Sequence, residues 1–118
     1  MAIQNPMGPD RLELNIVGRS ARAAAFSAIR AGMEVSAADA FGDEDLRAVS
    51  RYKGPVPFPR GLLRALHAMP DAPFIYTGGL DDRPRILARL ARARPLWGNG
   101  GDATRGARDP FLLSLIHI

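Results

Sequence analysis

The sequence contains no cysteine, a single lysine and two histidines. Without cysteine, the chain forms neither a disulfide framework nor a thiolate metal site. The lone lysine, Lys53, does not follow a glycine-rich loop, so the sequence has no Walker-type phosphate loop. His67 and His117 have no further ligands at metal spacing. These absences exclude several common classes of site at the outset.

Long apolar runs are missing as well. No stretch is long enough to span a bilayer, and residues 1–10 lack the basic and apolar regions of a signal peptide. We therefore expect a cytoplasmic protein with no membrane partner. Of the 118 residues, 47% are hydrophobic and 24% are charged, which is the composition of one globular domain.

The formal net charge of +4 comes almost entirely from arginine. Arginine is accompanied here by abundant alanine, glycine and proline, the combination that GC-rich codons encode. No aromatic residues interleave with the arginines as stacking platforms for bases. We therefore interpret the basic surface as solvated and expect no nucleic-acid partner. An RNA-binding face formed by Arg85, Arg89 and Arg92 stays as a weaker alternative.

Apolar stretches that alternate with helical patterns predict parallel βαβ units. The first unit is a buried strand at 12–17, a turn at Gly18, and an alanine-rich helix that Ser20 caps and Gly32 ends. The predicted fold is a three-layer α/β domain, a Rossmann-like parallel sheet of about four to five strands with helices on both faces. Further strands are predicted at 33–38, 73–76 and 96–97, and at best a short edge strand around Val56 and Phe58. Further helices are predicted at 44–50 and 60–68, and a last one begins after a cap at Asp81 or Asp82.

The turns that follow the strands of a parallel sheet all lie along its carboxyl edge, where such folds receive ligands. We call this row of turns the rim. Glycines at the rim let backbone N–H groups approach an anion, and the helix after Ser20 directs its positive end toward the same place. Arg19 and Arg22 can bind the carboxylate or phosphate group of such an anion. The glycines serve equally well as plain tight turns, the interpretation we favour at 98–101. The predicted substrate-binding residues are Gly18, Arg19, Ser20, Asp39, Thr77, Gly78, Gly79 and Asn99; no catalytic or metal-binding residue is predicted.

A dinucleotide-binding turn requires the pattern G-x-G-x-x-G, whereas the sequence from Gly18 reads G-R-S-A-R-A. Side chains at the second and third glycine positions hinder the approach of a pyrophosphate and close packing of the helix. Asp39 does stand about 20 residues further on, where a ribose-binding acid belongs. Because the acidic residue is present but the glycine pattern is not, we disfavour an NAD site.

Four segments taken together resemble a known family. They are I-V-G-R-S-A-R-A-A-A-F-S-A-I-R-A-G from Ile16, A-A-D-A-F from Ala37, Y-T-G-G-L from Tyr76, and P-L-W-G-N-G before R-D-P-F. The set is similar to the N-terminal domain of ATP-grasp proteins, in particular of predicted ATP-dependent carboligases related to biotin carboxylase. The resemblance covers about residues 12–111, and the motifs are specific as a set although each alone is weak.

This resemblance implies a Rossmann-like domain that helps to shape the substrate site of an ATP- and magnesium-dependent ligase. Such a ligase activates a carboxylate as an acyl phosphate and passes it to an amine or another nucleophile. The parent protein would use ATP, magnesium and small-molecule carboxylate and nucleophile substrates. Its ATP-clamping lysines and Glu/Asn magnesium ligands belong to later domains, so we expect this chain alone to be inactive and to bind neither cofactor. The oligomeric state is left open.

The last six residues, LSLIHI, differ in composition from the Arg/Ala-rich chain before them. They are the literal translation of CTG TCT CTT ATA CAC ATC, which resembles the end sequence left by a transposase-based sequencing library. We therefore expect a truncated fragment with a flexible lead-in at 1–10, the Rossmann-like domain at 11–112 and a non-native tail at 113–118. A natural C-terminal strand or helix stays an alternative, and with it a stand-alone Rossmann-like module that binds a nucleotide or a small anion.

Overall fold

Four strands and four helices make up the part of the chain that the computed structural model describes, residues 12–99, with two helices in succession between the second and third strands. The predicted lead-in and tail therefore lie outside the described residues. None of the helices in the described part is long and apolar enough to cross a bilayer. The elements are β1 (Glu13–Val17), α1 (Arg22–Arg30), β2 (Glu34–Ala38), α2 (Glu44–Val49), α3 (Leu62–Ala68), β3 (Phe74–Tyr76), α4 (Pro84–Ala93) and β4 (Leu96–Asn99).

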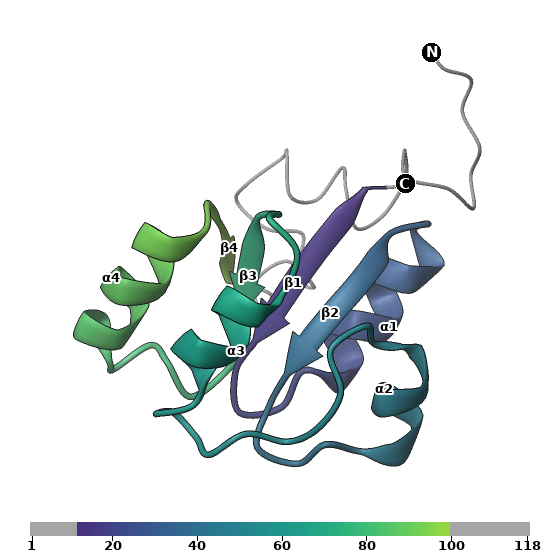
Figure 1. The fold of residues 1–118 in the computed structure, drawn as a ribbon, viewed down its shortest axis with the longest axis horizontal. Helices are drawn as coiled ribbons and strands as arrows, with labels where there is room; N and C mark the ends of the chain where they lie inside the picture. Colours follow the sequence, from purple (N-terminus) through teal and green to yellow (C-terminus); the bar gives the residue numbers. More distant parts are fainter. Residues whose placement is uncertain (1–11, 100–118) are drawn as a thin grey trace.

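The strands form one parallel sheet in the order β2-β1-β3-β4 (Figure 1). After β1 the chain builds β2 on one side of it, and then crosses back to build β3 on the other side. The direction of winding therefore reverses between β1 and β3. In open α/β sheets the crevice at such a reversal, outside the carboxyl ends of the strands, is the usual ligand site.

Helices cover both faces of this sheet, which confirms the predicted three-layer α/β fold. On one face, Ala24, Ala25 and Ala28 of α1 pack against Leu14 and Ile16 of β1. These small side chains let α1 lie close to the strands. On the other face, α3 and α4 contribute Leu62, Leu66 and Leu90 to a second apolar cluster. Figure 1 shows α1 behind the sheet and α3 in front of it.

Two predicted helix caps are wrong. Helix α1 has Ala21 at its N-cap and no side-chain cap, because the carboxylate of Asp39 at the end of the neighbouring strand accepts the Ala21 N–H at 2.8 Å. Ser20 stays exposed. Helix α4 has Arg83 at its N-cap, so neither predicted aspartate takes that place, although Pro84 begins the helix as expected.

The predicted edge strand around Val56 and Phe58 does not form, and the segment between α2 and α3 is irregular. Pro55, Pro57 and Pro59 have no N–H group to donate to a strand ladder. The Val56 N–H instead bonds to the carbonyl of Asp39 at 2.9 Å. This bond brings the proline-rich segment alongside the rim.

The C-terminal end of α3 is held by two polar side chains from other elements. Arg94, just after α4, donates to the carbonyls of Pro70 and Met69 at 3.1 and 3.0 Å. The buried Asn15 amide of β1 donates to the carbonyls of Pro70 and Ala72, both at 3.0 Å. These bonds go to the C-cap residue Met69 and to the segment just after α3, and they fix that segment against both β1 and the end of α4.

Candidate functional site

The turns after β1 and β3 meet directly at the rim. The Thr77 N–H donates to the carbonyl of Val17 at 2.9 Å, and the Arg19 N–H donates to the carbonyl of Gly78 at 3.0 Å. A β-carbon at Gly18 would lie 1.8 Å from Thr77 Oγ1, so no side chain fits there. Gly18 is therefore required for close approach of the two turns. The structure thus brings the predicted turn residues after β1 together with those after β3 in one cluster.

Arg19 is the exposed charge of this cluster. Its guanidinium lies over the ring of Phe58, with Cζ 4.9 Å from the ring centroid, and no carboxylate among the described residues forms an ion pair with it. A β-carbon at Gly79 would lie 2.7 Å from the same ring, and Gly79 has a φ of +95°. Phe58 thus covers Gly79 and supports Arg19. Sequence reasoning missed this role, because Phe58 reaches the rim through the irregular proline-rich segment.

Asp39 lies at the rim, and its carboxylate serves the protein's own backbone. It is 1% exposed, and its two oxygens accept the N–H groups of Ala21, Phe41 and Gly42 at 2.8, 3.0 and 2.8 Å. Charge-assisted bonds of this kind are about twice as strong as neutral ones. Asp39 therefore ties the start of α1 to the turn after β2, and its predicted contact with substrate stays a prediction.

Of the two arginines predicted to bind an anion, Arg22 is engaged elsewhere. Its Nε donates to Oδ2 of Asp45 at 2.8 Å, and both side chains are about half exposed. This hydrogen bond lowers the pKa of Asp45 below its ordinary range and raises the pKa of Arg22. Arg19 is thus the guanidinium at the rim without an ion-pair partner among the described residues.

Neutral donors and acceptors complete the rim. The first-turn N–H groups of α1 after Ala21 have no side-chain cap, although the carboxylate of Asp39 already meets part of the positive end of this nine-residue helix. Thr77 is 7% exposed, and its Oγ1 has no hydrogen-bond partner within the described part of the chain. Asn99 ends β4 beside Tyr76, which places its backbone at the same edge; its side chain lies outside the description. The rim can thus offer positive charge and N–H groups to an oxyanion.

The described residues do not fit a site for ATP and magnesium. Lys53 lies in the loop after α2, where its Nζ donates to the carbonyl of Arg47 at 2.7 Å. In residues 12–99, no group of three His, Asp or Glu side chains is arranged to hold a metal ion.

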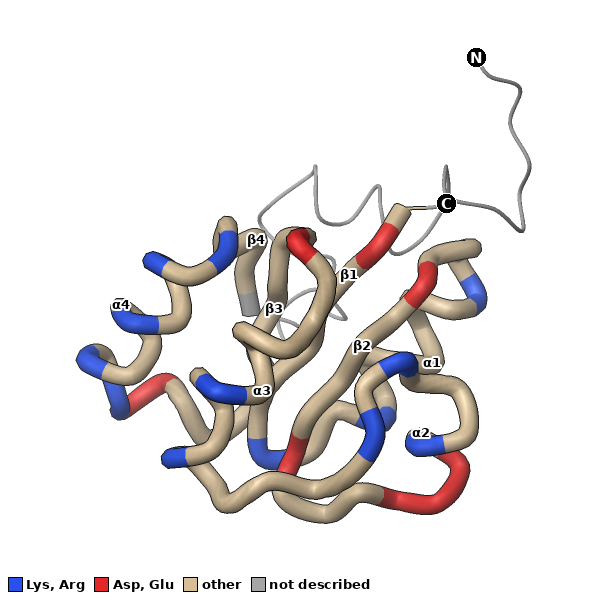
Figure 2. The backbone as a smooth tube through the Cα atoms, viewed as in Figure 1, with Lys and Arg blue, Asp and Glu red and all other residues tan. Residues whose placement is uncertain are grey.

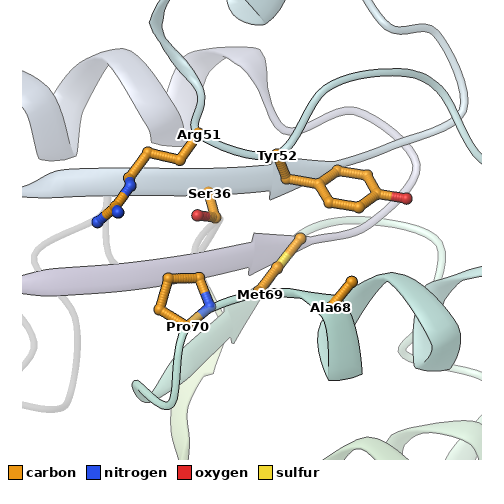
Figure 3. A pocket seen from close by; sticks show the side chains of 6 residues that line it. All are labelled: Ser36, Arg51, Tyr52, Ala68, Met69 and Pro70. Atoms are coloured by element: carbon orange, nitrogen blue, oxygen red, sulfur yellow. The ribbon is translucent and has the colours of Figure 1, made fainter.

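A concavity apart from the rim lies on the α3 face of the sheet, at its β2 edge. It measures about 450 Å³ and has the buried Ser36 on its floor. Figure 3 shows Arg51 and Tyr52 on one side of it, with Pro70, Met69 and Ala68 on the other. Arg51 bridges Glu13 and Glu34, each at 2.9 Å. Its charge is thus met within the protein, which makes this hollow a poor anion site.

Comparisons with models of protein families, with curated proteins and with solved structures find no match. The resemblance to ATP-grasp proteins therefore stays a prediction. The geometry itself supports one candidate, the rim between β1 and β3.

Proposed function

We propose that this chain is the N-terminal, substrate-side domain of an ATP-grasp ligase, and that its rim between β1 and β3 binds the carboxylate substrate. The observation that carries the proposal is the meeting of two glycine turns around Arg19 at the point where the winding of the sheet reverses. The motif set from Ile16 to Phe111 supports the family, and the parallel three-layer fold agrees with the domain it implies.

A carboxylate suits the donors that the rim offers. Arg19 presents a planar guanidinium whose paired N–H groups match the two oxygens of a carboxylate. The first-turn N–H groups of α1 add neutral donors beside the positive end of the helix. The described residues would hold the carboxylate, and the ATP-dependent activation that the family resemblance implies would be carried out by residues of later domains.

The test is made on the full reading frame that encodes this domain. ADP formation is measured with ATP, magnesium and a panel of carboxylates and amines, and the active pair is then studied with Arg19→Gln. We expect ADP release to depend on the carboxylate, and Arg19→Gln to raise its KM by about tenfold, the loss of one partly exposed charge-assisted contact. The KM for ATP stays unchanged.

Arg30→Gln is the matched control, because Arg30 is exposed at the far end of α1 and bonds to Ser27 at 3.2 Å. It removes the same charge and leaves both KM values unchanged. Equal effects of the two substitutions, or ADP release that is independent of any carboxylate, would contradict the proposal. If no further domain exists and this chain binds an anion at the rim by itself, a stand-alone binding module becomes the better account.

A further inference from the structure

A separate hollow lies between the outer surfaces of α3 and α4. It measures about 380 Å³, and it is lined by Leu63 and His67 of α3 and by Arg89, Arg92 and Ala93 of α4. We call it the α3–α4 hollow. Leu63 and Ala93 are half-buried and form apolar lining, whereas the two arginines and the histidine are exposed. The hollow therefore combines an apolar wall with three side chains that carry N–H donors.

The positive charge of this hollow has no ion-pair partner among the described residues. Neither Arg89 nor Arg92 forms an ion pair within residues 12–99. Arg85 and Arg89 stand four residues apart on α4, and Arg89 and Arg92 three apart, so like charges lie side by side on the helix. Figure 2 shows basic positions recurring along α4, with acidic positions only in the loop that leads into it. A bound anion would relieve this repulsion.

The α3–α4 hollow is distinct from the rim. In a parallel sheet each connecting helix runs from the carboxyl edge back toward the amino edge. His67 stands in the last turn of α3 and Arg92 in the last turn of α4, so both lie toward the edge opposite the rim. Figure 1 shows the two helices side by side. The two sites share no lining residue.

We infer that the α3–α4 hollow binds a doubly charged oxyanion of the phosphate type. Two guanidiniums balance two negative charges, and each offers a planar pair of N–H groups that matches two oxygens of a phosphate. The imidazole of His67 adds one further N–H donor. Leu63 and Ala93 form an apolar wall beside these exposed donors. Free phosphate and a phosphomonoester present the same chemistry.

The experiment follows backbone amide NMR shifts of the 118-residue chain during titration with inorganic phosphate, with glycerol phosphate and with acetate, at constant low ionic strength. We expect phosphate to shift amides in the last turns of α3 and α4 with millimolar affinity, and acetate to bind at least about tenfold more weakly because it carries one charge. Tighter binding of glycerol phosphate would identify a phosphomonoester as the ligand, and tighter binding of inorganic phosphate would identify the free ion.

Arg89→Gln with Arg92→Gln should weaken phosphate binding by at least about tenfold. The matched control, Arg30→Gln with Arg47→Gln, removes the same charge from exposed arginines on α1 and α2 and should leave the affinity unchanged. Equal losses in the two double variants would overturn the inference, because they would indicate attraction to net charge alone. Shifts confined to the rim, or no shifts at all, would overturn it as well. Failure at the α3–α4 hollow leaves the ligase proposal standing, because that proposal rests on the rim alone.

Discussion

Asp39 is the residue whose substitution tests how the rim is built. Asp39→Ala removes the acceptor of three backbone N–H groups, those of Ala21, Phe41 and Gly42. We expect the domain to lose stability, because the Ala21 N–H lies in the interior and has no second acceptor within the described residues. Asp39→Asn keeps the size of the side chain and one acceptor oxygen, but it places an NH₂ group against at least one of the backbone N–H donors.

The magnitude follows from the burial of each N–H group. The bond to Ala21 is buried, and leaving this donor unpaired costs about 1–3 kcal/mol. Losing a negative charge at the positive end of α1 adds about 0.3–1 kcal/mol. The bonds to Phe41 and Gly42 are partly buried, so water replaces the acceptor there at a smaller cost. The expected loss is about 3 kcal/mol for Asp39→Ala and about 2 kcal/mol for Asp39→Asn.

Thermal and urea unfolding, followed by circular dichroism, measure these losses. A loss of about 3 kcal/mol corresponds to a Tm lower by about 12 °C for a domain of this size. Ser20→Ala is the control at the same rim, because Ser20 is exposed and does not cap α1, and it should change the stability by less than about 0.5 kcal/mol. An Asp39→Ala protein as stable as the wild type would refute the internal role of this carboxylate.

Three further substitutions test other contacts. Gly18→Ala should cost about 1–3 kcal/mol in urea unfolding, since its β-carbon would overlap Thr77 Oγ1, whereas Gly78→Ala meets nothing within 4 Å and should be neutral. Arg94→Gln should cost about 2 kcal/mol in the same assay, because it removes the guanidinium that bonds to the carbonyls after α3. Asp45→Asn should lower Tm at neutral pH. That difference should shrink as the pH falls from about 5 to about 3, because Asp45 has a lower pKa folded than unfolded and its contribution is lost on protonation.

Each of these predictions has a result that contradicts it. Equal stability of the two glycine variants would mean that the turns of β1 and β3 move apart at little cost. An Arg94→Gln protein as stable as the wild type would mean that water replaces the guanidinium at these carbonyls at no cost. A Tm difference for Asp45→Asn that grows as the pH falls would reverse the sign of its pKa shift.

Local patterns were sufficient to predict the fold of the described residues. The apolar strand Leu14 to Val17, the small-residue face of α1 and the left-handed Gly32 are each encoded within a few residues, and the structure has all three. Alternation of such units indicates a parallel sheet, and the rule for its carboxyl edge then collects the turns at Gly18 and Thr77. The direct contact between these two turns depends on β1 and β3 being neighbours in the sheet, which no local sequence pattern specifies.

The details of the site depend on contacts between distant segments. Asp39 caps α1 because β2 lies beside β1, a neighbour relation that local patterning does not specify. Arg22 pairs with Asp45 across 23 residues, which removes it from the rim. Phe58 reaches Arg19 because the proline-rich segment is held at Asp39, and no periodicity marks that path. Residue type indicated which side chains carry charge, and tertiary structure decided which stay available.

The most direct test of the ligase proposal is to sequence the source DNA downstream of the codons for Asp109 and Pro110. The account predicts that the reading frame continues there, without the LSLIHI codons, into a domain with ATP-clamping lysines and a Glu/Asn magnesium site. A frame that instead encodes LSLIHI and then stops, with no lysine-bearing domain, would contradict it.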